Sequence, residues 1–210
     1  MHLCIEIHTQ ATFSPKKMTG KNVIEEIIRN YYTVSKNSME ALINFVEFQT
    51  LPSKTLFIKS GFKNDYDYFL LSGICRSYVV NQKGEDITIS FFQDKTILTP
   101  NVARTFKNQS TLTFEALTDI EIGRFKAIEL VKLMREISEM RNFANAVLQQ
   151  ELILKSKKEL YNASLTAKER LKIFRQQFNS LENIIPHPII ASYLGITNIS
   201  LSRLRAELAK

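Results

Sequence analysis

The stretch PHPIIASYLGITNISLSRLR, Pro186 to Arg205, decides how the C-terminal part of this sequence folds. Pro188 suits the first turn of a helix, where a missing N–H costs nothing, and Gly195 suits the left-handed residue that ends a helix. Thr197 can then cap a second helix with its hydroxyl oxygen. The stretch therefore predicts two short helices joined by a tight turn, the second running from Asn198 to Leu208.

The apolar spacing predicts how these two helices pack. Ile190 and Leu194 share one face of the first helix, and Ala191 is small enough to let the second helix approach. The same core is closed by three further residues, Ile196, Leu201 and Leu204. This is the helix-turn-helix pattern, a packing geometry that also occurs in helical hairpins without a nucleic-acid ligand.

A helical wheel separates the sides of the second helix. The outward side carries Ile199, Ser202, Arg203 and Ala206. Arginine can bind a guanine edge, serine can hydrogen-bond a base, and an apolar side chain can pack on a thymine methyl. Residues beside this row are expected to contact phosphates, which position a protein without specifying sequence. The candidate DNA-binding residues are Thr197, Asn198, Ile199, Ser200, Ser202, Arg203 and Arg205.

Alternatives stay open at single positions. Arg203 is expected at a base, with a phosphate contact or a solvated charge as the alternative. Ser202 is equally compatible with a base contact and with solvent, whereas Thr197, Ser200 and Arg205 are better placed for phosphates.

Charge favours a polyanionic partner for the same region. The chain has 28 Lys and Arg against 21 Asp and Glu, a net charge of +7. Residues 163–210 contain seven basic and three acidic side chains, a net charge of +4. More than half of the excess charge therefore lies in the last quarter of the chain, as double-stranded DNA would require of a partner.

Upstream, the pattern changes twice. Residues 22–49 have helical spacing. From about Leu51 to Phe125, short β-branched and aromatic runs alternate with turns, which predicts an antiparallel β-roll of jelly-roll type and an α+β class overall. The predicted strands are Thr55–Ile58, Tyr66–Leu71, Ile74–Val80, Ile87–Phe92, Leu112–Ala116 and Ile120–Phe125.

Residues 127–162 are predicted to form one long helix. A heptad count places Ile137, Met140, Ala144, Val147 and Leu154 on one seam, together with Glu151 and Lys158. This apolar stripe favours a homodimer, and packing against the chain's own β-roll is the alternative.

Four segments follow from these patterns. Residues 1–21 are expected to be a leader, with Met18 as an alternative start, residues 22–126 a β-roll with N-terminal helices, 127–162 a dimer helix, and 163–210 a helix-turn-helix domain. A hinge is expected at Asn162–Leu165. Thr166 and Glu169 have the spacing of a capping box, in which each caps the other's amide.

Several function classes are excluded by what the sequence lacks. No apolar run approaches the roughly 18 residues of a bilayer span, so we expect a soluble, cytoplasmic protein without a membrane partner. Cys4 and Cys75 are too few for a zinc or iron–sulfur site of four thiols and are expected to be reduced. No histidine lies between residues 22 and 126 for a cupin-like metal site, and no Gly-x-Ser-x-Gly occurs. We expect no enzyme activity, catalytic residue, metal or cofactor.

The order of β-roll, long helix and helix-turn-helix resembles the Crp/Fnr family of regulators, and more narrowly its Bacteroidetes-type subgroup. The resemblance implies a homodimer whose second C-terminal helices enter the DNA major groove, with RNA polymerase as a further candidate partner and an effector of unknown chemistry. It is carried by Pro52–Gly61 (PSKTLFIKSG), Asp67–Gly73 (DYFLLSG), Gly84–Phe92 (GEDITISFF), Ile190–Thr197 (IASYLGIT) and Leu201–Leu204 (LSRL).

Two departures from the family pattern limit what can be carried over. Cyclic-nucleotide sensors of the family carry a Gly-Glu pair and later an Arg-Ser-Ala-like turn, where this chain has Ile97–Val102 and Gln109–Leu112, with Arg104 several residues away. We therefore expect that cyclic AMP does not bind. Ile199 also stands where the family commonly has an acidic residue, so no operator sequence is carried over. A small-molecule-sensing module without DNA binding is the alternative function.

Overall fold

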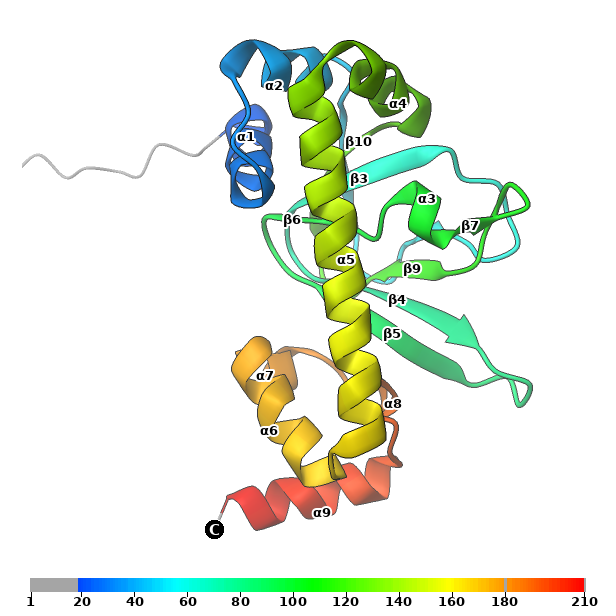
Figure 1. Cartoon of the computed structure of the whole chain (residues 1–210). Coiled ribbons are helices and arrows are strands. Elements are labelled where there is room, and N and C mark those ends of the chain that lie inside the picture. Colours follow the sequence, from blue (N-terminus) through cyan, green and yellow to red (C-terminus); the bar gives the residue numbers. More distant parts are fainter. Residues whose placement is uncertain (1–18, 180, 210) are drawn as a thin grey trace, which may run out of the picture.

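The structure is a computed structural model that describes residues 19–179 and 181–209. Figure 1 shows the β-roll in the upper half, α5 running down beside it, and the C-terminal helices at its lower end. The helices are α1 (Gly20–Tyr31), α2 (Lys36–Ile43), α3 (Asn101–Arg104), α4 (Ala127–Glu136), α5 (Ser138–Ser164), α6 (Ala167–Gln177), α7 (Leu181–Ile184), α8 (His187–Leu194) and α9 (Asn198–Leu208). The strands are β1 (Glu47–Leu51), β2 (Leu56–Ile58), β3 (Tyr66–Ser72), β4 (Cys75–Val80), β5 (Asp86–Phe92), β6 (Thr96–Ile97), β7 (Thr105–Phe106), β8 (Gln109–Ser110), β9 (Thr113–Ala116) and β10 (Ile120–Lys126).

Two four-stranded antiparallel sheets form the β-roll, which confirms the predicted α+β class. Their strand orders are β1-β10-β3-β6 and β2-β9-β4-β5, and β7 and β8 form a separate hairpin. Buried side chains between the sheets, among them Leu70, Phe114 and Ile122, make one core. Each of the six predicted strand runs matches one strand of these sheets to within one residue at either end.

The prediction of helix through residue 49 is wrong at its end. Helix α2 stops at Ile43, and Glu47–Leu51 forms β1, which pairs with β10 in the register Phe48 to Gly123. The reason is tertiary: β10 would otherwise present an unpaired edge, and the ladder of backbone hydrogen bonds outweighs an apolar spacing that runs on to Val46. The strands β6, β7 and β8 have two residues each, too few to show a period in sequence.

The predicted leader extended too far into the folded chain. Helix α1 begins at Gly20, where the hydroxyl of Thr19 accepts a hydrogen bond from the amide of Asn22 at 3.4 Å. The remaining leader, including Cys4 and Met18, lies outside the described residues.

The single long helix predicted for residues 127–162 is instead two helices. Ile137 has extended angles (φ −121°, ψ 111°) and separates α4 from α5. The break lets Leu133 of α4 and Met140 of α5 enter the same core, beneath α1 and α2. The side chain of Arg141 donates to the carbonyl of Met134 at 3.1 Å, so the C-terminal end of α4 is satisfied.

The predicted seam of α5 is divided between the inside and the outside of the subunit. Met140 and Val147 are buried against the chain's own N-terminal helices and β-roll, and Ala144 is buried between them in sequence. Packing within the subunit, the alternative left open by the sequence, is therefore what these positions do. Leu154 remains 49% exposed about two turns further on, beyond the edge of that core.

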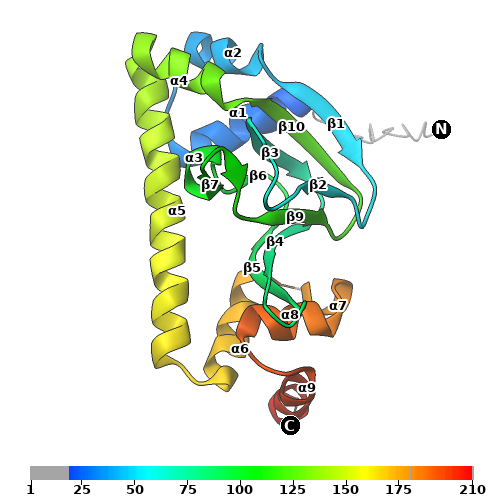
Figure 2. The same cartoon turned by 90° about the vertical axis from the view of Figure 1, so that its right-hand side faces the viewer.

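The C-terminal helices dock onto the β-roll through a third core. Phe91 of β5 and Ile74 join Phe174 of α6 and Ile190 of α8 in one buried cluster. Figure 2 shows α8 lying against the lower end of β5, with α9 below it and the outer side of α5 uncovered. This contact fixes the orientation of the last two helices relative to the roll.

Helices long and apolar enough to cross a membrane are absent from the described residues. Cys75 is buried and has no disulfide partner among the described residues, and burial raises the pKa of its thiol. A buried thiol held in its protonated form is unreactive, which suits a packing role.

Candidate nucleic-acid interface

Helices α8 and α9 are joined by the turn that the sequence predicts. Pro188 lies in the first turn of α8, and Gly195 ends that helix with left-handed angles (φ 66°, ψ 36°). A side chain at Gly195 would be strained in this backbone conformation even though open space surrounds it. Thr197 caps α9, whose observed span confirms the predicted bounds, by accepting from the amide of Ser200 at 3.2 Å.

The core of the motif also matches its sequence pattern. Ile190, Ala191, Leu194 and Leu201 are buried together, and Ile196, Leu204 and Leu208 pack against them half-buried. The hairpin is therefore held by apolar packing on one side of α9 alone, which leaves the opposite side free.

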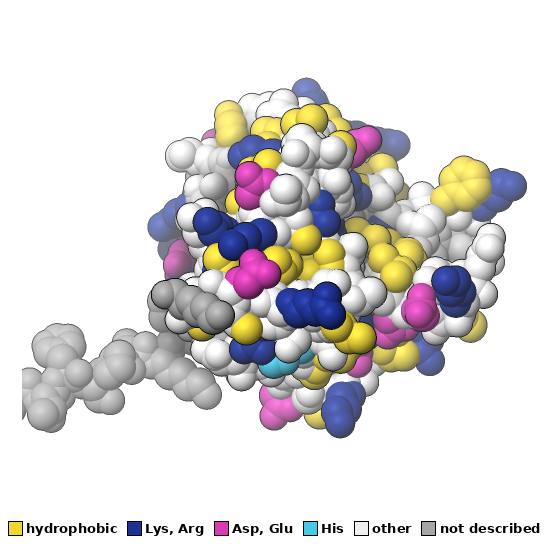
Figure 3. Space-filling model, turned by 90° about the horizontal axis from the view of Figure 1, so that it is seen from below, with side chains coloured by type: hydrophobic (Ala, Val, Ile, Leu, Met, Phe, Trp, Pro, Cys, Tyr) yellow, Lys and Arg dark blue, Asp and Glu magenta, His cyan; other side chains and the backbone are white. Residues whose placement is uncertain are grey.

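That opposite side is exposed over its whole length. Ile199 is 69% exposed, and Ser202, Arg203 and Ala206 are exposed with it. Arg203 has no ion pair within residues 19–179 and 181–209. Figure 3, seen from the α9 end, shows Lys and Arg side chains spread over this face with apolar ones between them. This surface therefore offers an unpaired guanidinium, which can donate hydrogen bonds to a guanine edge, beside an apolar side chain, which can contact a thymine methyl group.

The remaining candidates flank this row. Asn198 is exposed in the first turn of α9. The hydroxyls of Thr197 and Ser200 lie 2.9 Å apart and share a hydrogen bond at the same end of the helix. The amides and hydroxyls of a helix N-terminus suit a phosphate group.

Arg205 faces a different neighbour from the one that the sequence suggested. Its Nε lies 2.9 Å from the carboxylate of Glu182, which also accepts from Arg175 at 2.6 Å. A guanidinium nitrogen of Arg205 also lies 3.0 Å from Nδ1 of His187. In this arrangement Arg205 ties α9 to α7 and α8, a role that sequence inspection missed because Glu182 gave no local signal.

Internal contacts occupy much of the C-terminal charge. Lys168 pairs with Glu207 at 3.2 Å. Arg170 donates to the carbonyls of Leu165 and Leu194, which joins the start of α6 to the end of α8. Among the described basic residues from position 163 onward, only Lys172 and Arg203 lack such partners. Fewer basic side chains are therefore free to meet a polyanion than the net charge of this region suggests.

Comparisons with known proteins place this architecture. A scan against protein-family models and a search of curated proteins found no match. Among solved structures, FixK2 from Bradyrhizobium japonicum is similar, with a TM-score of 0.69 and 18% identity over 78% of this chain and 84% of that one. The c-di-GMP-responsive global regulator CLP from Xanthomonas campestris gives a TM-score of 0.66 and 13% identity over 83% of this chain and 92% of that one.

A Eubacterium rectale chain described as a transcriptional regulator of the Crp/Fnr family gives a TM-score of 0.66 and 17% identity, over 83% of this chain and 85% of that one. The fold is that of the Crp/Fnr regulators. At these identities the likeness establishes the architecture, and the chemistry of each site has to be taken from this chain's own residues.

Within this Crp/Fnr-type fold, the region that departs from the cyclic-nucleotide pattern is filled by Arg104. The side chain at the end of α3 is 1% exposed. Its Nε donates to the carbonyl of Thr99 at 3.1 Å, and Nη2 donates to Asn64 at 3.1 Å and to the carbonyl of Tyr66. Burial lowers the pKa of this guanidinium, with Asp67 acting in the opposite direction. The arginine is thus held by the backbone of the roll itself.

The described residues contain no group of three or more His, Cys, Asp or Glu side chains that could hold a metal ion. His187, at the start of α8, is exposed, and Nδ1 of its ring lies 3.0 Å from a guanidinium nitrogen of Arg205. His2 and His8 lie outside the described residues.

Proposed function

We propose that this chain is a sequence-specific, non-enzymatic DNA-binding regulator of transcription of the Crp/Fnr type that acts as a homodimer. The observation that carries the proposal is the outward side of α9, which is exposed along its length while the opposite side of α9 packs on α8. A helix presented in this way can enter the major groove, where base edges are distinguishable.

The roles of single residues follow from their places on α9. Arg203, Ser202 and Ile199 face outward and would contact base edges. Thr197, Asn198 and Ser200 lie at the N-terminal end, where the helix dipole and free amides favour a phosphate. Arg205 would reach a phosphate only by leaving Glu182, so we assign it first to positioning α9.

The dimer would use a different side of α5 from the one that the heptad count selected. Leu148 and Leu152 lie four residues apart on the uncovered side and are exposed, Leu152 by 66%. The side of α5 carrying Met140, Ala144 and Val147 is already buried within the subunit. An exposed leucine row on a helix of 27 residues supports an interface between two copies of this chain.

We propose further that the β-roll does not bind cyclic AMP. Arg104, the nearest candidate for a phosphate contact, is 1% exposed. Its Nε and Nη2 donate to Thr99, Asn64 and Tyr66 inside the roll, and its Nη1 is buried without a partner among the described residues. No other charged residue of Ile97–Val102 or Gln109–Leu112 could replace it, since these stretches contain none.

The test is selection of bound duplexes from random DNA by the full-length protein. The expected result is a pseudo-palindromic sequence whose half-sites lie about one helical turn, roughly 10 base pairs, apart. A selection that enriches no sequence would favour a small-molecule-sensing module without DNA binding. Enrichment of a single unpaired half-site would contradict the homodimer and leave the α9 interface supported.

A further inference from the structure

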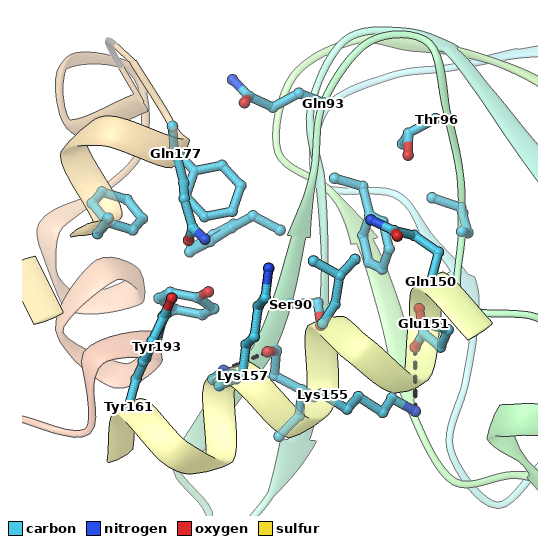
Figure 4. A pocket seen from close by; sticks show the side chains of 18 of the residues that line it. Ser90, Gln93, Thr96, Gln150, Glu151, Lys155, Lys157, Tyr161, Gln177 and Tyr193 are labelled. Carbon is cyan, nitrogen blue, oxygen red and sulfur yellow. Dashed lines mark hydrogen bonds and ion pairs between the residues drawn. The ribbon is translucent and has the colours of Figure 1, made fainter. Parts of the chain in front are cut away.

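A cleft of about 1050 Å³ separates the lower half of α5 from the β-roll and the helix-turn-helix. Figure 4 shows its sides: Lys155, Lys157 and Tyr161 on α5, Gln177 at the end of α6, Tyr193 on α8 and Ser90 on β5. All four elements therefore border one space. Its volume is at the upper end of the range for small-molecule sites. It is also distinct from the interior of the roll that holds Arg104.

The floor of the cleft is aromatic. The rings of Phe91, Phe174, Phe178 and Tyr193 pack with centroids 5.0–6.0 Å apart, and all four residues line the cleft. This cluster joins β5 to α6 and α8. A flat apolar group seated on it would contact the sensor and the DNA-binding helices simultaneously.

The rim of the cleft is cationic and incompletely neutralised. The ammonium group of Lys158 lies 3.8 Å from the centre of the Tyr193 ring and donates to the carbonyls of Thr88 and Ile89. Neither Lys158 nor its neighbour Lys157 has a carboxylate within 4.0 Å among the described residues, whereas Glu151 is paired with Lys155 at 3.2 Å. A partly buried ammonium held only by neutral groups favours an anion beside it.

We propose that this cleft is an effector site for an organic anion with an apolar, aromatic body. The anionic group would lie against Lys157 and Lys158, and the aromatic body against Phe91, Phe178 and Tyr193. Burial lowers the pKa of Lys158 to about 8, which is consistent with an ammonium that lacks a counter-ion. The dimer row of Leu148 and Leu152 lies on another side of α5, so a second copy would leave the cleft open.

The site would act on the proposed DNA binding through the hinge between α5 and α6. The cleft is lined on one side by Tyr161, Asn162 and Ala163 in the last turn of α5, which continues through most of the predicted hinge to Ser164, and on the other by Arg170 and Ile173 of α6. A ligand that spans both sides would hold α6 and α8 against α5 and fix where α9 lies. This consequence rests on the proposed function, whereas ligand binding itself does not.

The test uses the full chain and a matched pair of fluorescent probes. 8-Anilinonaphthalene-1-sulfonate carries an aromatic body and an anion, and N-phenyl-1-naphthylamine carries the same body without the sulfonate. We expect saturable binding of one sulfonate per chain, and at least about tenfold weaker binding of the uncharged probe, since a charge-assisted contact exceeds the free energy of a tenfold change. Equal affinity for both probes would overturn the anionic specificity.

Variants locate the probe. Lys157→Glu reverses a rim charge and Gln177→Trp fills space at the cleft, and each should weaken sulfonate binding at least about tenfold. Lys59→Glu is the matched control, because it makes the same charge reversal at an exposed site directly after β2, outside the cleft, and should change nothing. Unchanged binding in both cleft variants would place the probe elsewhere and overturn the site.

A last measurement separates this inference from the proposed function. Probe binding is recorded without DNA, so a chain that bound no DNA would still test the cleft. With the selected duplex present, saturating sulfonate should shift the dissociation constant for DNA at least about threefold. An unchanged constant at saturation would overturn the regulatory part of the inference.

Discussion

The hydroxyl oxygen of Ser192 in α8 lies 2.7 Å from the amide nitrogen of Thr88 in β5 and accepts its hydrogen bond. The same hydroxyl donates to the carbonyl of Asp86 at 3.0 Å. Strand β5 is the edge of its sheet, and an unpaired edge strand invites pairing with other chains. Helix α8 thus covers an edge of the β-roll, and the roll and the C-terminal helices share one hydrogen-bond system.

Removing this hydroxyl should loosen the domain contact measurably. Ser192→Ala leaves the Thr88 amide without its partner, so the free energy of unfolding should fall by about 1 kcal/mol. Amide hydrogen exchange at Thr88 should become faster. Ser202→Ala is the control, since Ser202 is exposed on α9 and its loss should change stability by less than about 0.5 kcal/mol. An unaltered exchange rate at Thr88 would show that the hydrogen bond to Ser192 does not protect the edge strand β5.

Arg203 should determine sequence specificity. Its exposed, unpaired guanidinium is free to reach a base edge, so Arg203→Ala should weaken binding to the selected duplex by about 1–3 kcal/mol and relax the preference at one base pair. Competition binding against single-base variants of the duplex measures both effects. An equal loss for every variant would reassign Arg203 to a phosphate.

Arg205 poses a sharper question because Glu182 already holds it. If its role is to position α9, Arg205→Ala and Glu182→Gln should both weaken DNA binding and both leave its dependence on salt concentration unchanged. A phosphate contact predicts a different pair of outcomes: Arg205→Ala reduces the salt slope by about 1 and Glu182→Gln does not. Binding isotherms at four salt concentrations distinguish these cases.

Two neighbouring leucines on α5 test where a second copy binds. Leu152 is on the uncovered side and Leu154 lines the interdomain cleft, and both are exposed. Leu152→Lys should prevent the proposed dimer from forming, because a charge would be buried in an apolar seam, whereas Leu154→Lys should leave the mass unchanged. Light scattering after size exclusion measures both. A monomer produced only by Leu154→Lys would restore the seam of the heptad count.

Cyclic AMP should leave the protein unaffected. A ligand that binds only the folded state adds to the free energy of unfolding, by about 2.7 kcal/mol at a concentration one hundred times its dissociation constant, and so raises the unfolding temperature. We expect no shift in the thermal unfolding curve with about 1 mM cyclic AMP, at which even micromolar affinity would be detected. A clear upward shift would show that the roll recognises the nucleotide by residues other than Arg104.

The features that the sequence predicted correctly are those with local signals. The cap of α9 by Thr197 and the left-handed Gly195 involve residues within a few positions of one another. The capping box of Thr166 and Glu169 at the start of α6 is of the same kind. Backbone geometry makes such residue types necessary at these positions, so they can be identified without a fold.

The features that the sequence could not predict depend on distant partners. Ser192 and Thr88 are 104 residues apart. The break at Ile137 follows from the joint burial of Leu133 and Met140 under α1 and α2, which no helical period encodes. The same core turned the predicted seam inward, because a heptad pattern specifies an apolar stripe and not the surface that will cover it.

Lys158 should make stability depend on pH in the mildly alkaline range. Burial lowers its pKa from 10.5 to about 8. Between these values the unfolded chain binds a proton that the folded chain has released, so the free energy of unfolding should rise with pH across this window.

Burial also raises the pKa of Tyr193 from 10.0 to about 12. For that reason, and because burial also raises the pKa of the Cys75 thiol from its ordinary value of 9.0, denaturant titrations should run from about pH 7 to pH 8.5, below the range in which these two groups reverse the trend. Lys158→Met should flatten the rise, and Lys157→Met, which alters an exposed neighbour, should reproduce the wild-type slope. Parallel curves for wild type and Lys158→Met would mean that hydrogen bonds to Thr88 and Ile89 keep the buried ammonium charged throughout.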